Sequence, residues 1–378
     1  MNVTVVTRVL LHYRKPFFEL LREEMARHGM ELRLIYGQYS QAEKTKGDEV
    51  DLPWGLKVQN RYLGFGIRSP VYQPCLAYCL RSDIVVVEPA ARLLLNYLLQ
   101  TSCYFVGTKL VLWTHGRSFD ERAGSVVERF KAWNRHGVSW WFAYTELSAE
   151  TLQASGISRD RITVLNNSVD TEGMRAQFES VTETEKQALR DRLGLGEGPV
   201  GIYCGSLYRE KRIDFMLDAA CRIRGRIPGF QMIIAGSGPE TESVVRTASG
   251  SDFLHYVGPV FAKDKAILFS VGDVNLNPGR IGLGILDGFT FEVPVVTTAN
   301  PHHSPEVVYL ENGRNGLVTK DNLDAYVSDV AELLEDRKKL EVLKASCRED
   351  RGKYTIRNMV ARFAEGLELV AAEGRPVA

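Results

Sequence analysis

The sequence predicts an α/β protein made of two successive units, each with a parallel sheet crossed by helices. Short runs of β-branched and other apolar residues alternate with longer amphipathic segments along the chain. This alternation is interrupted once, by a charged and glycine-rich stretch before Pro199, and then restarts. The length of 378 residues also suits two domains of ordinary size.

The first unit is predicted from six apolar runs. A segment with apolar residues at helical spacing follows the first run from Pro16, and an apolar helix follows the third from about Ala91. Four consecutive β-branched residues end the third run, which indicates a strand buried on both faces. The expected strands are Val3–Leu10, Glu31–Tyr36, Asp83–Val87, Lys109–Trp113, Trp140–Tyr144 and Ile162–Leu165.

The second unit repeats the pattern. Its expected strands are Val200–Cys204, Gln231–Ala235, His255–Val257, Val274–Leu276 and Val293–Thr297, with helices over Ile213–Arg224 and Glu240–Thr247. We assign residues 1–170 to a first domain, 171–198 to a linker and 199–355 to a second domain. Two such domains are Rossmann-like halves that face a central cleft, and the last amphipathic segment, 356–371, is expected to pack back on the first.

The composition excludes several classes of protein. Lysine and arginine number 47, as do aspartate and glutamate, so there is no global basic field to hold nucleic acid or an anionic membrane. Hydrophobic residues make up 44%, which excludes disorder as the main state. The six cysteines have no metal-binding or disulfide spacing, which favours a reducing compartment. Charged residues interrupt the N-terminal apolar run, so we expect no signal peptide and a cytoplasmic protein, or one peripheral at the inner face of the cell membrane.

The most informative stretch is the strand-to-helix turn over residues 277–289. Glycines at such a turn let the backbone approach a ligand closely and direct N–H groups at it. Asp287 falls near the start of the following helix, where it would either accept hydrogen bonds from a diol or complement the helix dipole. The spacing alone favours neither interpretation.

Two other loops follow expected strands of the second unit. Gly236 and Gly238 form a lone G-x-G turn, for which a structural role is favoured over direct ligand contact. The loop Gly205–Arg212 carries three cations within four residues and suits a phosphate site at the carboxyl end of a central strand. A solvated helix start has the same composition.

In the first unit, two titratable side chains directly follow expected strands. His115 is thereby placed at the sheet edge where parallel sheets bind ligands, whereas a core histidine normally lies within an element. Glu88 follows the buried strand that ends at Val87 and is a second candidate at this edge. His302 and His303 either line the cleft or are solvated.

Taken in order, these motifs resemble glycosyltransferase family 4 from about residue 3 to residue 370. The resemblance rests on Thr114–Gly116, Asn167–Asp170, Gly205–Lys211, Ile233–Pro239, the glycine turn that ends at Asp287, and Pro305–Glu306 followed by Asn312–Val318. It implies the GT-B fold, in which the C-terminal domain binds most of the donor nucleotide and the N-terminal domain most of the acceptor. It also implies metal-independent transfer from a nucleotide-diphosphate sugar, with retention of the anomeric configuration and no further cofactor.

The resemblance implies roles for individual residues. Asp287 would hold the ribose hydroxyls, Lys211 would neutralise the diphosphate, and His115 would lie near the transferred sugar. Arg209 would join Lys211 and His115 in the catalytic group. The other donor-binding candidates are Gly205, Ser206, Gly236, Gly238, Val257, Gly279, Arg280, Ile281, Gly282, Leu283 and Gly284, and the acceptor-side candidates are His12, Tyr13, Arg14, Glu88 and Arg117.

Two positions depart from the family's usual pattern. Gly279 and then Arg280 stand where the family usually has a glutamate eight residues before the second acid, and Ser206 stands where an arginine usually precedes the lysine. The N-terminal loop Leu11–Phe18 is similar to the tyrosine-arginine-proline-phenylalanine pattern of bacterial members that build surface polysaccharides.

The expected function is therefore retaining transfer of a sugar to a hydroxyl of a saccharide or lipid-linked glycan in polysaccharide or glycoconjugate biosynthesis. A GT-B nucleotide-sugar epimerase and a catalytically silent nucleotide-sugar-binding protein are the alternatives. A dehydrogenase is disfavoured, because no strand leads into a full G-x-G-x-x-G.

One local patch leaves contact with a membrane open. Lys131, Trp133, Arg135, Trp140 and Trp141 combine basic and aromatic side chains that would suit a bilayer and a lipid-linked acceptor. The same residue types are equally typical of a core and its solvated faces.

Overall fold

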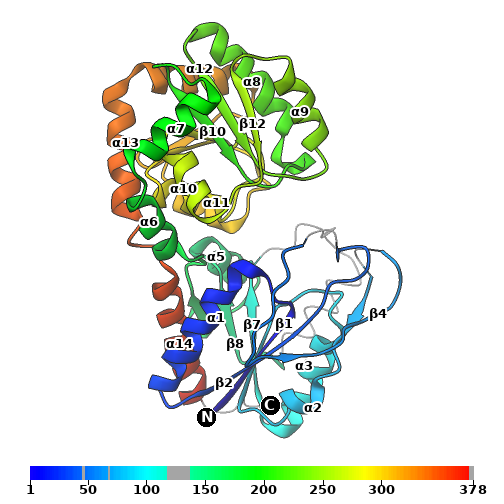
Figure 1. The fold of residues 1–378 in the computed structure, drawn as a ribbon. Coiled ribbons are helices and arrows are strands. Elements are labelled where there is room, and N and C mark those ends of the chain that lie inside the picture. The colour runs from blue at the N-terminus through cyan, green and yellow to red at the C-terminus, as the bar shows by residue number, and fades with distance from the viewer. Residues whose placement is uncertain (45–46, 67–68, 117–136, 374–378) are drawn as a thin grey trace. The chain divides into compact units, whose positions relative to one another are not determined.

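The computed structural model describes residues 1–44, 47–66, 69–116 and 137–373. The chain divides into two compact units (Figure 1). The first contains Met1–Val169 and the segment from Ile356 onward, and the second contains Asp170–Thr355. Each unit has one main parallel sheet with helices on both faces, which confirms the predicted fold class.

The first sheet has seven strands in the order β3-β2-β1-β6-β7-β8-β9. The strands are β3 (Leu56–Lys57), β2 (Glu31–Gly37), β1 (Asn2–Val9), β6 (Ile84–Val87), β7 (Lys109–Thr114), β8 (Trp140–Ala143) and β9 (Ile162–Val164). The chain runs outward in one direction from β1 to β3 and in the other from β6 to β9, so the switch point lies between β1 and β6. Loops that leave the carboxyl ends of strands at such a point diverge and leave room for a ligand.

Helices cover both faces of this sheet. One face is covered by α1 (Lys15–Arg27) and α14 (Ile356–Ala372), and the other by α2 (Leu76–Cys79), α3 (Leu94–Val106) and α5 (Glu146–Ala154). A small antiparallel sheet of β4 (Arg61–Tyr62) and β5 (Val71–Tyr72) lies outside the main sheet. Cys75, Cys79 and Cys103 are buried in the core under α2 and α3, as small apolar residues would be.

The second sheet has six strands in the order β12-β11-β10-β13-β14-β15. The strands are β12 (Leu254–Gly258), β11 (Gln231–Ala235), β10 (Val200–Cys204), β13 (Val274–Leu276), β14 (Val295–Thr298) and β15 (Gly316–Thr319). Helices α8 (Ile213–Arg226), α9 (Thr241–Ser249), α12 (Leu323–Glu335) and α13 (Arg337–Asp350) share one core, and α6 (Thr171–Glu179), α7 (Glu183–Leu193) and α10 (Ala262–Ser270) share the other. Here the switch point lies between β10 and β13.

The segment 171–198 differs from the linker that the sequence predicts. It folds as α6 and α7, which pack against α10 within the second unit. Asp170 caps α6 by accepting a hydrogen bond from the amide of Gly173, and Thr182 caps α7. The many charged residues face solvent, while apolar side chains among them, such as Phe178 and Leu189, reach the core.

Helix α14 returns to the first unit and completes its core. The ring of Phe363 lies among the rings of Phe17, Trp113 and Phe142, with centroid distances of 5.6, 5.5 and 4.6 Å. At the far end of the helix, the ammonium group of Lys109 donates to the carbonyl oxygens of Val370 and Ala371 at 2.6 and 3.0 Å. This lysine satisfies carbonyls that a helix end leaves without intrahelical partners.

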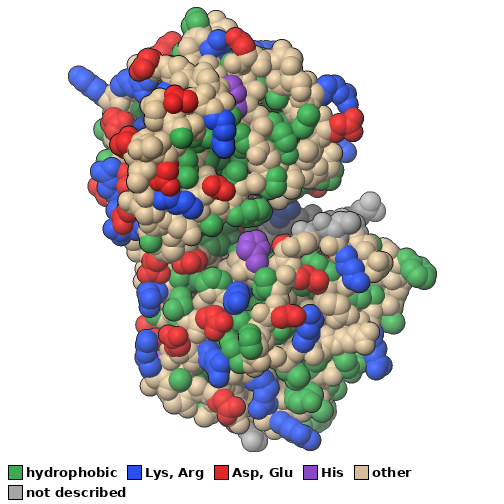
Figure 2. Space-filling view, viewed as in Figure 1, with side chains coloured by type: hydrophobic (Ala, Val, Ile, Leu, Met, Phe, Trp, Pro, Cys, Tyr) green, Lys and Arg blue, Asp and Glu red, His purple; other side chains and the backbone are tan. Residues whose placement is uncertain are grey.

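The structure corrects part of the proposed membrane patch. Trp140 and Trp141 are only 6% and 4% exposed and pack in the two cores on either side of β8. Lys131, Trp133 and Arg135 lie outside the described residues. Within the described ranges, every helix is too short or too polar to cross a bilayer. On the face drawn in Figure 2, basic and acidic side chains are interspersed over both units.

The packing of α14 predicts a large effect of one truncation. Phe363→Ala should lower the free energy of unfolding of the first unit by about 3–5 kcal/mol, because it leaves a cavity among three aromatic rings. The matched control is Leu369→Ala on the same helix, where the side chain is 54% exposed and the change should stay within about 0.5 kcal/mol. Urea unfolding followed by tryptophan fluorescence measures both. Equal effects of the two variants would contradict this account.

Candidate functional site

Two loops that flank the switch point of the second sheet are joined backbone to backbone. The amide of Arg280 donates to the carbonyl of Glu210 at 2.7 Å, and the ammonium group of Lys211 donates to the carbonyl of Arg280 at 2.6 Å. A Cβ atom at Gly279 would overlap the carbonyl group of Lys211 and lie 2.6 Å from that of Glu210. The turn therefore requires glycine at 279, and no side chain, including the family's usual glutamate, fits there without a backbone shift.

Lys211 lies in this junction as a largely buried cation. It belongs to the short helix η5 (Arg209–Lys211) after β10, and its ammonium group also lies 5.7 Å from the ring centre of Tyr208. Burial and the positive charge of Arg280 lower the pKa of Lys211 to about 8, and the charge of Asp287 opposes this shift only in part. A buried amine beside another cation attracts an anion. Arg209, by contrast, is exposed to solvent.

Asp287 is paired with a lysine that the sequence analysis missed. It lies in α11 (Gly284–Thr290), is only 7% exposed, and accepts a hydrogen bond from the ammonium group of Lys265 in α10 at 2.6 Å. Burial opposes the charge of Lys265, but the carboxylate of Asp287 raises the pKa of this lysine above its ordinary value. The thiol of Cys204 lies nearby, and burial raises its pKa to about 11, so it stays protonated. No local pattern distinguishes Lys265 from other helical lysines.

A third loop holds the glycine turn through a histidine. Nδ1 of His303 accepts from the amide of Ile281 at 3.1 Å, and Nε2 donates to the carbonyl of Thr298 at 2.8 Å. Burial, together with the charges of Lys211 and Arg280, lowers the pKa of His303, so the ring is neutral. Both of its nitrogens are thus engaged in positioning the loop after β13. His302 is exposed.

Three other glycines of the donor-side group, Gly236, Gly238 and Gly282, are places of close approach. A Cβ atom at Gly282 would lie 2.9 Å from Ser304 Cβ and 3.2 Å from Glu306 Oε2. Gly236 and Gly238 have φ values of +143° and +158°, and a Cβ atom at either would overlap a carbonyl oxygen of the Gly205–Leu207 loop. The structural interpretation of the G-x-G turn accounts for both glycines. Leu283 precedes α11, and Ser206 is exposed.

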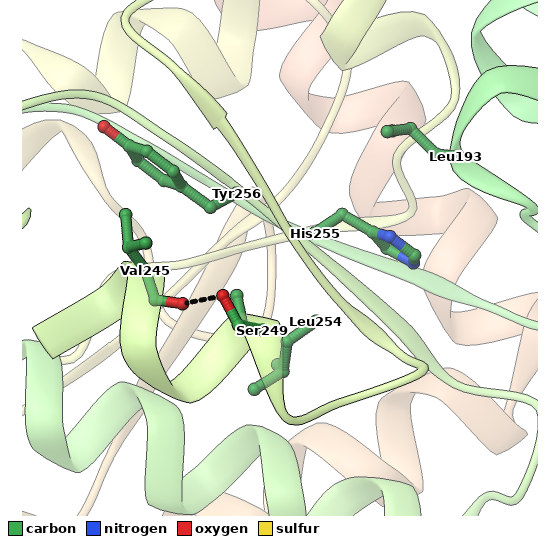
Figure 3. A pocket seen from close by; sticks show the side chains of 7 residues that line it. Leu193, Val245, Ser249, Leu254, His255 and Tyr256 are labelled. Carbon is green, nitrogen blue, oxygen red and sulfur yellow. Dashed lines mark hydrogen bonds between the residues drawn. The ribbon is translucent and has the colours of Figure 1, made fainter. Parts of the chain in front are cut away.

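Two hollows of the second unit border the edge strand β12. A hollow of about 480 Å³ is lined by Val257, Pro259 and residues of α7 and α10. Another, of about 310 Å³, lies beside the edge strand β12 and is lined by His255, Tyr256 and residues of α7 and α9 (Figure 3). His255 forms a hydrogen bond with Gln231 Oε1 at 2.8 Å, and the described residues that line this hollow include no lysine or arginine. It is therefore a poor site for a diphosphate.

In the first unit, Arg14 is buried among aromatic rings. It lies in η1 (His12–Arg14) after β1, is 7% exposed, and donates to Asn167 Oδ1 at 2.8 Å. Its guanidinium lies 4.9 Å from the ring centre of Trp113 and 5.7 Å from that of Tyr144. Arg14 thus packs against the rings of Trp113 and Tyr144, while Tyr13 is half-buried and His12 is exposed.

The imidazole of His115 contacts the ring of Tyr144. His115 follows β7, its side chain is exposed, and its ring centre lies 3.9 Å from that of Tyr144. Gly116 next to it has φ of +79°, and a Cβ atom there would lie 2.6 Å from the carbonyl oxygen of Ser148. Arg117 lies outside the described residues. The sequence thus places His115 correctly at a carboxyl strand end.

Glu88 is a half-buried carboxyl group at the carboxyl end of β6. Burial raises its pKa above the usual range, and three neighbouring arginine charges oppose the shift only in part. These arginines are Arg14, Arg8 and Arg92. No hydrogen bond or ion pair of this carboxyl group to the described residues is formed. A carboxyl group with this placement can accept a hydrogen bond from an incoming hydroxyl.

Residues 1–44, 47–66, 69–116 and 137–373 contain no group of three or more His, Cys, Asp or Glu side chains arranged to hold a metal ion. The groups that could meet a ligand are instead cations and backbone amides in the second unit, and aromatic, histidine and carboxyl groups in the first.

Comparison with known proteins finds a family match within the second unit. Residues 198–336 match the family described as glycosyl transferases group 1. A GDP-mannose-dependent α-(1-6)-phosphatidylinositol monomannoside mannosyltransferase of Mycobacterium tuberculosis is 31% identical over 175 residues, which are 43% of this chain and 45% of that protein. An α-D-kanosaminyltransferase of Streptomyces kanamyceticus is 27% identical over 163 residues, 41% of each chain. The chain therefore matches less than half the length of these relatives.

Solved structures agree with the fold over the whole chain. A glycosyltransferase from Rickettsia africae superposes with a TM-score of 0.73 at 12% identity and covers 99% of both chains. The Anabaena protein Alr3699/HepE, solved in complex with UDP, superposes with a TM-score of 0.69 at 13% identity and covers 97% of this chain and 100% of that one. Identities this low establish the GT-B architecture alone.

The junction at Gly279 predicts a specific sensitivity. Gly279→Ala should destabilise the second unit by about 1–3 kcal/mol, because the added methyl group meets backbone that cannot rotate away. Hydrogen exchange of the Arg280 amide should become faster as its bond to Glu210 is lost. The control is Gly225→Ala in α8, where nothing lies within 4 Å and the change should stabilise by up to about 1 kcal/mol. An Arg280 amide with unchanged protection in Gly279→Ala would refute the junction.

Proposed function

Since the chain belongs, through residues 198–336, to the group 1 glycosyltransferases, we propose that it transfers a sugar from a nucleotide-diphosphate sugar to an acceptor hydroxyl. The observation that carries this proposal is the pairing of two features at one edge of the second sheet. These are the largely buried cation Lys211 in the junction at Gly279 and the carboxylate of Asp287 in α11, the helix that follows this junction. A nucleotide-diphosphate sugar offers one anionic part and one diol to match them.

On the donor side, each feature receives one part of the substrate. Lys211, with the exposed Arg209 beside it, meets the diphosphate, and the amides of Gly282, Leu283 and Gly284 point to the same group. Asp287 accepts hydrogen bonds from the ribose hydroxyls. One relative is named as GDP-mannose-dependent and one structural neighbour was solved in complex with UDP, so uridine and guanosine nucleotides are the first donors to test.

The chemical step is substitution at the anomeric carbon of the donor sugar. The bond from that carbon to the diphosphate oxygen breaks, and negative charge grows on the leaving phosphate. Lys211, Arg209 and the backbone amides stabilise this charge. The acceptor hydroxyl attacks on the face being vacated, its oxygen forms the new glycosidic bond, and its proton passes to the departing phosphate oxygen. The configuration of the sugar is therefore retained.

On the acceptor side, the first unit supplies groups that orient rather than react. His115, held on Tyr144, orients the sugar or polarises a hydroxyl. Glu88 accepts a hydrogen bond from the acceptor, a saccharide or a lipid-linked glycan. Arg14 acts through Tyr144 rather than by direct contact, because its guanidinium is buried and bonded to Asn167.

Incubation with labelled UDP- and GDP-sugars, with and without lipid-linked saccharide acceptors, tests the proposal. We expect labelled acceptor with unchanged anomeric configuration, and Lys211→Ala should slow turnover at saturating donor by about tenfold or more, because the leaving charge loses its cation. Turnover within about a factor of two of the parent would reject this electrostatic role. An altered free sugar without acceptor would indicate an epimerase, and tight binding without chemistry a silent binding protein.

The lowered pKa of Lys211 predicts a pH dependence of donor binding. A diphosphate needs the charged amine, and this amine loses its proton as pH rises through about 8. Affinity for a nucleotide sugar, whose phosphate charge is constant in this range, should fall about tenfold between pH 7 and pH 9. Calorimetry across this range measures it. Lys211→Met should bind weakly with no such slope, and an equal slope in that variant would assign the titration to another group.

A further inference from the structure

The ion pair between Lys265 and Asp287 joins two helices on one face of the second sheet. The lysine side chain is 22% exposed and that of the aspartate 10% exposed, and their polar atoms lie 2.6 Å apart. The lysine reaches the carboxylate across 22 residues of sequence, from α10 to α11. Only Oδ1 of Asp287 is used, and among the described residues Oδ2 has no hydrogen-bond partner.

A buried pair of this kind is not explained by stability alone. Removing two charges from water costs about as much as their attraction returns, and an apolar pair of similar volume serves a core equally well. The position supports a functional reason, because Asp287 lies at the ligand-binding edge of the sheet and retains one open oxygen. The lysine fixes the other oxygen, and with it the orientation of the carboxylate.

We propose that Lys265 is a positioning residue that holds the carboxylate of Asp287 in one orientation, so that its open oxygen receives the ribose diol of the donor. The inference rests on the proposed function, in which Asp287 meets the ribose. Lys265 itself does not touch the diphosphate in this assignment, since its ammonium group is committed to the carboxylate. In this assignment Lys265 supports binding of the ribose, whereas Lys211 binds the phosphates.

This assignment is tested by measuring whether the protein binds a nucleotide that has the ribose diol more tightly than one that lacks it. UDP, GDP and ADP are compared by calorimetry, and the tightest binder is then compared with its 2′,3′-dideoxy counterpart. The parent should prefer the natural nucleotide by about tenfold or more, because hydrogen bonds to an ionised carboxylate are lost in the analogue. Lys265→Met should reduce this preference to about twofold or less, while Lys265→Arg, which keeps the charge, should retain most of it.

Matched variants separate a positioning role from general damage. Lys263→Met removes the neighbouring lysine, which donates to Ser180, and should leave the preference unchanged. Asp287→Asn should lose the preference, and adding Lys265→Met to it should change nothing further. Thermal unfolding of each variant shows whether it is folded, and a folded Lys265→Arg keeps the test decisive should Lys265→Met not fold.

The outcomes distinguish failure of the proposed function from failure of the role proposed for Lys265. Absence of binding by every nucleoside diphosphate would contradict the proposed function and this inference with it. Binding by the parent without any diol preference would overturn this inference and the ribose assignment of Asp287 on which it rests, but not the proposed transfer from a nucleotide-diphosphate sugar. A Lys265→Met variant that binds more weakly but keeps the parent's preference would mean that the lysine acts on the phosphates, which also overturns it.

Discussion

The candidate site of the second unit depends on one backbone contact, that of Gly279 and Arg280 with Glu210 and Lys211. The contact leaves no space for a Cβ atom, so it fixes the path of the loop after β13 relative to the loop after β10. His303 ties a third loop to the same turn by binding the amide of Ile281. Because α11 begins only a few residues later, these constraints also set where Asp287 stands. The candidate ligand-binding groups of three loops are therefore held in place by main-chain geometry.

The two lysines at this edge are in opposite electrostatic situations. Lys211 is largely buried beside Arg280 and bonded to a carbonyl rather than a carboxylate, so burial and like charge lower its pKa. Lys265 forms an ion pair with Asp287, and this carboxylate raises the pKa of the lysine despite burial. The first cation is incompletely neutralised and is available to an anion, while the second is already neutralised within the protein. The same residue type thus suits the ligand-binding role that we propose for Lys211 and the supporting role that we propose for Lys265.

Much of the fold was predictable from sequence, because parallel strands buried on both faces and amphipathic helices leave strong periodic signals. The positions of His115, Lys211 and Asp287 beyond the carboxyl ends of strands were predictable for the same reason, whereas their roles stay predictions. Lys265 was not predictable, because its partner is set by how two helices pack and nothing in its neighbourhood differs from an exposed helical lysine. The segment 171–198 was misjudged because its charged residues outnumber the apolar ones that anchor it. The need for glycine at position 279 depends on where a neighbouring loop lies, and no local sequence pattern shows this.

The return of α14 to the first unit has a consequence for synthesis of the chain. Phe363 and its neighbours complete a core whose other members come from residues before Val169, whereas the second unit is one continuous stretch. On the ribosome, the later unit can therefore close while the earlier one still waits for its final helix. A nascent chain that does not yet include α14 would present an unfilled apolar groove on α1 and β8 until that helix emerges, and exposed apolar surface of this kind is prone to aggregation.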